Sequence, residues 1–158
     1  MKLYIHFGYP RTGTTTLQIH LFPNHPQINY LGRYPRTKPK LELMDLISDL
    51  NNDDFDKRYN ELLKKAEELY LEPNKTNIMS SEYIILHAIY AHNNNDNFRT
   101  VSRAVSRINS LFSKIHVDVY FFGSIRSQSE IIRSLYIMST PELKGNMPCT
   151  GEEIIQYF

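Results

Sequence analysis

Residues 3–16 read Leu-Tyr-Ile-His-Phe-Gly-Tyr-Pro-Arg-Thr-Gly-Thr-Thr-Thr. The apolar run from Leu3 to Phe7 predicts a strand, and the stretch from Thr14 to Phe22 predicts a helix. The glycine-bearing turn between them predicts an anion site. Backbone N–H groups point at the ligand in such a turn, and the helix dipole favours negative charge there. The turn is therefore expected to hold a phosphate group.

The spacing of the glycines is that of a nucleotide-binding P-loop with one departure. Gly8 and Gly13 stand at the P-loop distance and threonines follow, but Thr14 occupies the position where the motif requires lysine. That lysine reaches the terminal phosphates of ATP or GTP, so its absence favours a different phosphorylated nucleotide. The positive charge of this loop is carried by Arg11 instead.

A second candidate phosphate site follows residues 117–123. The sequence Val-Asp-Val-Tyr-Phe-Phe-Gly is short, β-branched and aromatic, which predicts a buried strand. Arg126 stands at the end of this strand, and Ser134 lies eight residues further on (134 − 126 = 8), on the helix expected to follow. A guanidinium fork and a hydroxyl group together suit the oxygens of a phosphate. Taken alone, Arg126 is better explained as a surface arginine, and it is the combination with the first loop that favours a phosphate site.

The segment from Tyr9 to Thr15 resembles the 5′-phosphosulfate loop of sulfotransferases that use 3′-phosphoadenosine 5′-phosphosulfate (PAPS). Lysine is usual in that family at the position of Arg11. The spacing of Arg126 and Ser134 is similar to that of the arginine and serine with which the family binds the 3′-phosphate. The local sequence, including His25 to Gly32, looks most like that of bacterial, carbohydrate-type members. The resemblance covers the first and last thirds of the chain well and the middle loosely.

The resemblance implies a sulfotransferase with a P-loop NTPase-like fold, PAPS as donor and no metal. The acceptor would offer a hydroxyl or an amine, and a carbohydrate is preferred. The resemblance implies that the donor is bound by Pro10, Arg11, Thr12, Gly13, Thr14, Thr15, Arg126 and Ser134. Arg11 would stabilise charge on the leaving oxygen, and because arginine stays protonated it would not donate a proton as lysine could.

Glu82 is the candidate general base, because it follows the short strand expected at Asn77 to Ser80. Family members that act on carbohydrates use a glutamate after a comparable strand. An equally good interpretation makes Glu82 an acidic residue in the first turn of a helix, favoured by the dipole alone. The rival bases are His6, His20 and His87, of which His6 is expected to be packed within the first strand.

Alternating strand and helix patterns predict one three-layer α/β/α domain with a parallel sheet over residues 1–158. Helices are expected over Phe55 to Tyr70, Glu82 to Tyr90 and Phe98 to Ile115, and after Thr150. In such sheets ligands bind beyond the carboxyl ends of the strands. The three polar segments that fall there are Gly8 to Gly13, Ser80 to Glu82 and Ser124 to Arg126.

On the third of these helices Arg99, Arg103 and Arg107 recur every four residues. A solvated basic face is the favoured explanation of this pattern. A surface for an anionic acceptor is the minority alternative.

Composition bounds the remaining possibilities. The chain has 41% hydrophobic and 22% charged residues and a net charge of +1, which gives no reason to invoke nucleic acid or an acidic membrane surface. No apolar run approaches the length of a membrane span and no signal-peptide pattern is present, so a cytoplasmic protein is expected. The single cysteine and the scattered histidines predict no metal site.

Length raises a further expectation, because sulfotransferases are usually longer than 158 residues. The chain ends inside an expected helix, so a C-terminally incomplete domain is expected. Two alternatives stay open. One is a P-loop kinase or nucleotidase, in which Glu82 would help to hold Mg²⁺. The other is a nucleotide-binding fragment without catalytic activity.

Overall fold

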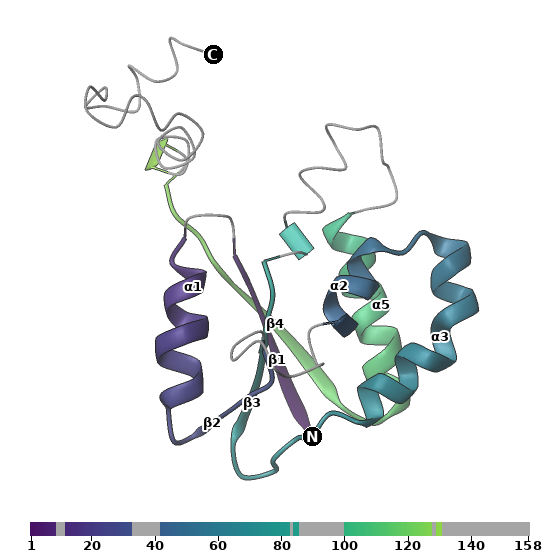
Figure 1. The fold of residues 1–158 in the computed structure, drawn as a ribbon, viewed down its shortest axis with the longest axis horizontal. Helices are drawn as coiled ribbons and strands as arrows, with labels where there is room; N and C mark the ends of the chain where they lie inside the picture. The colour runs from purple at the N-terminus through teal and green to yellow at the C-terminus, as the bar shows by residue number, and fades with distance from the viewer. Residues whose placement is uncertain (9–11, 33–41, 83, 86–99, 128, 131–158) are drawn as a thin grey trace.

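The protein is built around a parallel sheet of four strands with helices on both faces (Figure 1). The structure, a computed structural model, describes residues 1–8, 12–32, 42–82, 84–85, 100–127 and 129–130. The strands are β1 (Lys2–Gly8), β2 (Ile28–Tyr30), β3 (Thr76–Ser80) and β4 (Asp118–Ser124), in the spatial order β2-β3-β1-β4. The predicted α/β class with a parallel sheet is confirmed.

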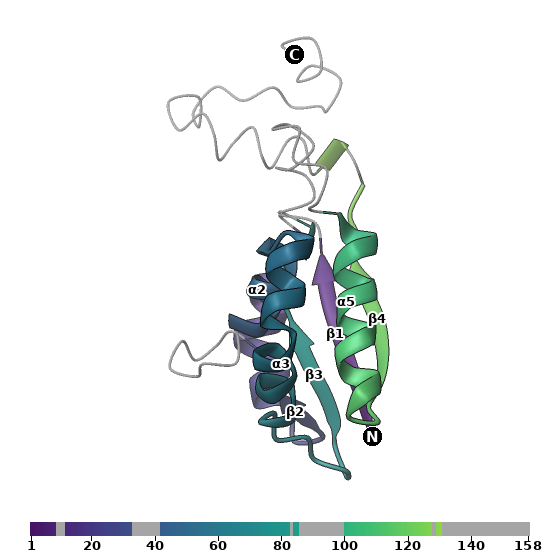
Figure 2. The same cartoon turned by 90° about the vertical axis from the view of Figure 1, so that its right-hand side faces the viewer.

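One helical run covers one face of the sheet. It begins as α1 (Thr14–Thr16), continues as the π-helix η1 (Leu17–Leu21) and ends as the 3₁₀ helix η2 (Phe22–Asn24). The opposite face carries α2 (Glu42–Asp49), α3 (Asn52–Glu67) and α5 (Val101–Lys114), as Figures 1 and 2 show. The helix predicted from Phe55 and the helix predicted up to Ile115 are therefore confirmed, with shifted ends.

Side-chain caps explain where two of these helices begin. The Asn51 side chain accepts a hydrogen bond from the backbone N–H of Asp54 at 2.8 Å, at the start of α3. Thr100 does the same for the N–H of Arg103 at 3.2 Å, at the start of α5. Each cap satisfies one of the donors that a helix leaves unpaired at its first turn.

The main apolar core lies between the sheet and helices α2, α3 and α5. Alternate residues of β1, Leu3 and Ile5, are fully buried and belong to this core. The helices contribute fully buried side chains that include Leu62, Ile108, Leu111 and Phe112. Each such side chain contributes about 1.5–3 kcal/mol relative to its exposed state. This core fixes β1 inside the sheet and with it the carboxyl end from which the predicted phosphate loop begins.

The prediction that residues 117–123 form a buried strand is wrong in its burial. β4 pairs with β1 and forms the edge of the described sheet. Its Val119 and Phe121 pack against the core, whereas Tyr120 and Phe122 are 45% and 38% exposed on the other face. Apolar residues on both faces of a strand predict burial on both faces. At the edge of the sheet, however, the side chains on one face of β4 are partly exposed to solvent.

The expected basic face is wrong for Arg107, which is a buried structural residue. It is 6% exposed, and its guanidinium lies 4.4 Å from the ring centroid of Phe55. It donates hydrogen bonds of 2.6–3.0 Å to the carbonyl groups of Ile47, Leu50 and Asn51 and to the side chain of Asn52. Arg107 thus satisfies carbonyls where α2 ends, while Arg103 is half-buried and Arg99 lies outside the described residues.

Two predicted helices fall mostly or wholly outside the described residues. Of the helix expected from Glu82 to Tyr90, residues 84–85 are described and are helical. The helix expected after Thr150 is not among the described residues. In the part of the chain that is described, every helix is too short or too polar to cross a membrane.

Candidate functional site

The sheet topology marks the carboxyl ends of β1 and β3 as the place for a ligand. These strands are neighbours. The connection from β1 to β2 contains α1, and the connection from β3 to β4 contains α5, and these two helices lie on opposite faces of the sheet (Figure 1). Ligands of open α/β sheets bind at such a switch point, beyond the carboxyl ends of the strands. The segment expected to bind the 5′-phosphate, which follows β1, begins at this point.

Two glycines shape this segment for different reasons. Gly13, at the start of α1, has φ of +83°, a conformation that residues with a Cβ rarely adopt. Gly8 is required by space, because a Cβ there would lie 2.5 Å from Cγ2 of Thr14 and 2.8 Å from Oγ1 of Thr12. Thr12 and Thr14 therefore lie close against Gly8, at the end of β1.

Thr14 takes the place of the P-loop lysine and points inward. Its side chain is buried at 2% exposure, and its Oγ1 donates a hydrogen bond to Oε1 of Glu82. Thr12 is half-buried and Thr15 is exposed at the first turn of α1. The predicted base is thus joined to the predicted phosphate loop by a direct contact.

Glu82 keeps one carboxylate oxygen for another partner. Within the described residues, its only side-chain hydrogen bond is the one from Thr14 to Oε1. The residue is half-buried just past the end of β3. It therefore lies where a carboxylate can be reached from outside while one of its oxygens is held in place.

The second predicted phosphate segment leaves the sheet beside the first. β1 and β4 pair in register up to their carboxyl ends, where Gly8 lies opposite Ser124. Neighbouring strands are about 4.8 Å apart. The two segments therefore leave the sheet side by side, close enough for one nucleotide to contact both. Arg126 is exposed two residues after β4, and its Nε donates to Oε2 of Glu130 at 3.0 Å. Arg126 thus lies beyond a strand end, and its role in binding phosphate stays a prediction.

Three predicted donor-binding residues lie outside the described residues: Pro10, Arg11 and Ser134. Their roles stay predictions. The residues that the structure does bring together at the carboxyl edge are Gly8, Thr12, Thr14, Glu82 and Ser124.

Sequence reasoning missed a buried hydrogen-bond network beneath this loop. His6, on β1, contacts the hydroxyl groups of serines on both neighbouring strands: Nδ1 lies 2.8 Å from Oγ of Ser80, and Nε2 lies 2.8 Å from Oγ of Ser124. Gln18, on the helical run, donates from Nε2 to Oγ of Ser80 at 2.9 Å. A polar residue near the end of each of three strands was the available signal.

The same network decides the rank of the rival bases. His6 is 1% exposed and packed against the rings of Phe22 and Phe122, and burial lowers the pKa of its imidazole below the ordinary 6.5. With both ring nitrogens engaged, it is packed as expected and out of reach of an acceptor. His20 is exposed on η1, seven residues past Gly13 and so about 10 Å along the helix. His87 lies outside the described residues.

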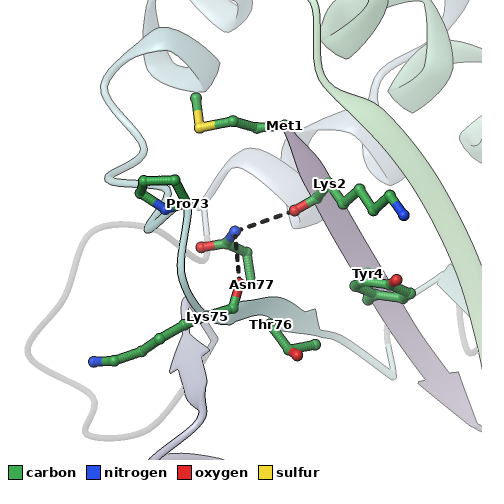
Figure 3. A pocket seen from close by; sticks show the side chains of 7 residues that line it. All are labelled: Met1, Lys2, Tyr4, Pro73, Lys75, Thr76 and Asn77. Atoms are coloured by element: carbon green, nitrogen blue, oxygen red, sulfur yellow. Dashed lines mark hydrogen bonds between the residues drawn. The ribbon is translucent and has the colours of Figure 1, made fainter.

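A cavity of about 350 Å³ lies at the opposite edge of the sheet. It is formed around the amino ends of β1 and β3 and lined by Met1, Lys2, Tyr4, Pro73, Lys75, Thr76 and Asn77 (Figure 3). Asn77 braces its wall through hydrogen bonds to the backbone carbonyls of Lys2 and Lys75, at 3.1 and 3.4 Å. None of the predicted site residues lines this cavity.

No protein-family model, curated protein or solved structure matches this chain. Among the described residues, there is no group of three or more histidine, cysteine, aspartate or glutamate side chains that could hold a metal ion. The candidate site therefore rests on the residues and contacts at the carboxyl edge.

Proposed function

We propose that the chain is a PAPS-dependent sulfotransferase that transfers a sulfuryl group to a hydroxyl or amine of an acceptor. The observation that carries the proposal is the common exit point of the two phosphate motifs. Gly8 and Ser124 are paired at the carboxyl ends of adjacent strands, so the loop before α1 and the segment of Arg126 start side by side. A nucleotide with phosphates at both its 5′ and 3′ positions needs two anion sites that lie close together.

The donor would be held from both ends. The backbone N–H groups of residues 12–15 face the 5′-phosphate at the start of α1, where the helix dipole favours an anion. Arg126 and Ser134 take the 3′-phosphate by resemblance, and an exposed guanidinium fork suits it. The salt bridge from Arg126 to Glu130 is exposed and therefore weak, so a phosphate can replace it.

The reaction needs alignment and charge stabilisation, by analogy with phosphoryl transfer. The acceptor oxygen or nitrogen forms a bond to sulfur, and the bond from sulfur to the 5′-phosphate oxygen breaks. Adenosine 3′,5′-bisphosphate leaves, with Arg11 stabilising the charge on its departing oxygen. Glu82 takes the proton of the acceptor.

The hydrogen bond from Thr14 supports the role of Glu82 as base. It fixes one carboxylate oxygen at the edge of the phosphate loop and leaves Oε2 for the acceptor. A base must lie within hydrogen-bond reach of the proton that it removes. The contact joins this carboxylate to the phosphate loop, which supports the role of base beside the alternative of an acidic residue favoured by the helix dipole.

The P-loop kinase or nucleotidase remains the rival function. It is disfavoured because Thr14 is buried and bound to Glu82, in the place of the lysine that would reach terminal phosphates. A carbohydrate acceptor is proposed from the resemblance.

A titration with adenosine 3′,5′-bisphosphate tests the proposal. We expect the wild type to bind this nucleotide, to bind ATP–Mg²⁺ more weakly, and to lose affinity when Arg126 is replaced by alanine. Because a hydrogen-bonded ionic contact contributes about 1.5–3 kcal/mol, the loss should be about ten- to a hundredfold. Preference for ATP–Mg²⁺ would favour the kinase, and nucleotide binding without sulfate transfer to any acceptor would favour a non-catalytic fragment.

A further inference from the structure

We infer that Ser124 donates a hydrogen bond to a phosphate oxygen of the bound nucleotide, and that His6 is the positioning residue that orients this hydroxyl group. The inference rests on the proposed function for its ligand. Its physical basis is the direction of the buried hydrogen-bond chain that runs from Gln18 through Ser80 and His6 to Ser124.

The direction is set at Ser80. Its side chain is fully buried, and its Oγ accepts a hydrogen bond from Nε2 of Gln18 at 2.9 Å. The hydroxyl hydrogen of Ser80 then needs an acceptor, because a buried donor without a partner costs about 1–3 kcal/mol. In the described part of the chain, the one other side-chain partner of this hydroxyl is Nδ1 of His6, at 2.8 Å. Ser80 therefore donates to His6.

This donation fixes the tautomer of the imidazole. A neutral imidazole has one N–H and one acceptor nitrogen, and burial favours the neutral form by lowering the pKa of His6. With Nδ1 accepting, the hydrogen is on Nε2 and is donated to Oγ of Ser124 at 2.8 Å. The chain is thus polarised outward, from the helical run to β4.

The last hydroxyl in the chain has a hydrogen left over. Ser124 accepts from His6 and, among the described residues, its side chain makes no other hydrogen bond. It is half-buried at the carboxyl edge, paired with Gly8 and two residues before Arg126. Its hydroxyl hydrogen is therefore available to an anion between the two proposed phosphate sites. Orientation by His6 makes Ser124 a donor before the ligand arrives.

The first test measures the tautomer without any ligand. ¹⁵N chemical shifts of histidine ring nitrogens distinguish protonated from unprotonated atoms, and the exposed histidines of the same sample serve as references. We expect His6 to show a protonated Nε2 and an unprotonated Nδ1. The opposite tautomer reverses the chain, occupies the hydrogen of Ser124 and overturns the inference, while the proposed function stands.

The second test titrates adenosine 3′,5′-bisphosphate into wild type, Ser124→Ala and the matched control Ser127→Ala. Ser127 is an exposed serine three residues further along the same segment. We expect about ten- to a hundredfold weaker binding for Ser124→Ala and no change for the control. Equal affinity of Ser124→Ala and wild type overturns the inference alone. Failure of the wild type to bind overturns the proposed function and, with it, the ligand assigned to Ser124.

A double-mutant cycle separates positioning from a merely structural role of His6. If His6 acts through Ser124, then His6→Gln weakens nucleotide binding in the wild type but adds little in the Ser124→Ala background. Full additivity of the two losses overturns the positioning role. Should His6→Gln fail to fold, the tautomer measurement on the wild type still decides the direction of the chain.

Discussion

Replacement of Gly8 by alanine tests how closely Thr12 and Thr14 pack against the end of β1. A Cβ at this position lies 2.5 Å from Cγ2 of Thr14, 2.8 Å from Oγ1 of Thr12 and 3.3 Å from Cβ of Ser124. Thr12 is half-buried. The Thr14 methyl lies nearest and cannot move away, since this side chain is buried at 2% exposure and held by its hydrogen bond to Glu82. The methyl contact with Thr14 therefore dominates the cost.

The expected magnitude follows from overpacking. Extra methyl groups in a packed site cost about 1–3 kcal/mol, which for a chain of this size corresponds to a fall in Tm of about 2–4 °C per kcal/mol. A second substitution, Thr14→Ser, should reduce the loss of stability caused by Gly8→Ala. It removes the methyl group that the new Cβ would contact and keeps the hydroxyl that donates to Glu82. Alone it should cost about 0.5–1.5 kcal/mol for the lost buried methyl.

Chemical denaturation of wild type, both single variants and the double variant measures the coupling. We expect Gly8→Ala/Thr14→Ser to be more stable than the sum of the single losses, by about 1 kcal/mol or more. Gly13→Ala is the matched control: its Cβ meets no atom within 4 Å, and its cost, about 1–2 kcal/mol, comes from φ of +83°. Thr14→Ser should not rescue that control. Strict additivity of the Gly8 and Thr14 variants would refute the methyl contact as the cause.

Three other outcomes are expected. Arg107→Lys should lower the free energy of unfolding by about 1–3 kcal/mol, because an ammonium group cannot reach the four acceptors that the guanidinium serves; Arg103→Lys is the control, and equal losses would contradict the buried role. The lowered pKa of His6 means that the unfolded state binds the proton more readily, so stability is complete above about pH 6.5 and falls as the pH drops below it. Denaturation at pH 5 to 7.5 gives the free energy of unfolding of wild type and of His6→Gln as a function of pH. The slopes of the two curves should differ by at most about 1.4 kcal/mol per pH unit, and parallel curves would contradict the lowered pKa. Glu82→Gln keeps an acceptor oxygen for Thr14, so donor binding should be unchanged. Because an amide cannot take the proton of the acceptor, sulfate transfer should fall by about a hundredfold or more. An undiminished rate would assign the proton to another group.

Hydrophobic periodicity and local composition predicted the helices and strands whose sequence patterns are strong. The strands at β1, β3 and β4 and the helices α3 and α5 were each expected close to their observed limits. β2 and α2 were not expected. β2 spans only three residues, too few for an alternation pattern, and it gains its place through parallel pairing with β3. Such pairing is a tertiary effect that a local window cannot contain.

Burial was harder to predict than element type. The residues of β4 are apolar on both faces, so the sequence indicated a buried strand, whereas the strand lies at the edge of the described sheet with one face partly exposed. The spacing of Arg107 indicated a charged surface, because a helical pattern cannot report that the turn between α2 and α3 presents unpaired carbonyls to that side chain. Both errors concern a partner element rather than the residue itself.

Part of the candidate site was predictable and part was not. Gly8, Gly13 and Glu82 were found because their chemistry is local: a tight turn, a left-handed residue and a carboxylate beyond a strand. The network of His6 was not predicted, because its partners Ser80 and Ser124 lie 74 and 118 positions away from His6 in the chain. Only the order of the strands brings them together.

Among the described residues, buried polar side chains differ in what they bind, and the difference bears on function. Asn77 and Arg107 bind backbone groups that the fold would otherwise leave unpaired, so folding alone explains them. His6 and Ser80 instead bind other side chains, and proteins can replace both partners of such a bond by apolar groups of the same shape at little cost in stability. A sheet that needed only to fold could fill this space with aliphatic residues, as the opposite face of β1 does with Leu3 and Ile5. The hydrogen-bonded network lies at the carboxyl edge, directly under the loop proposed to bind phosphate, which is where a ligand would give it a use.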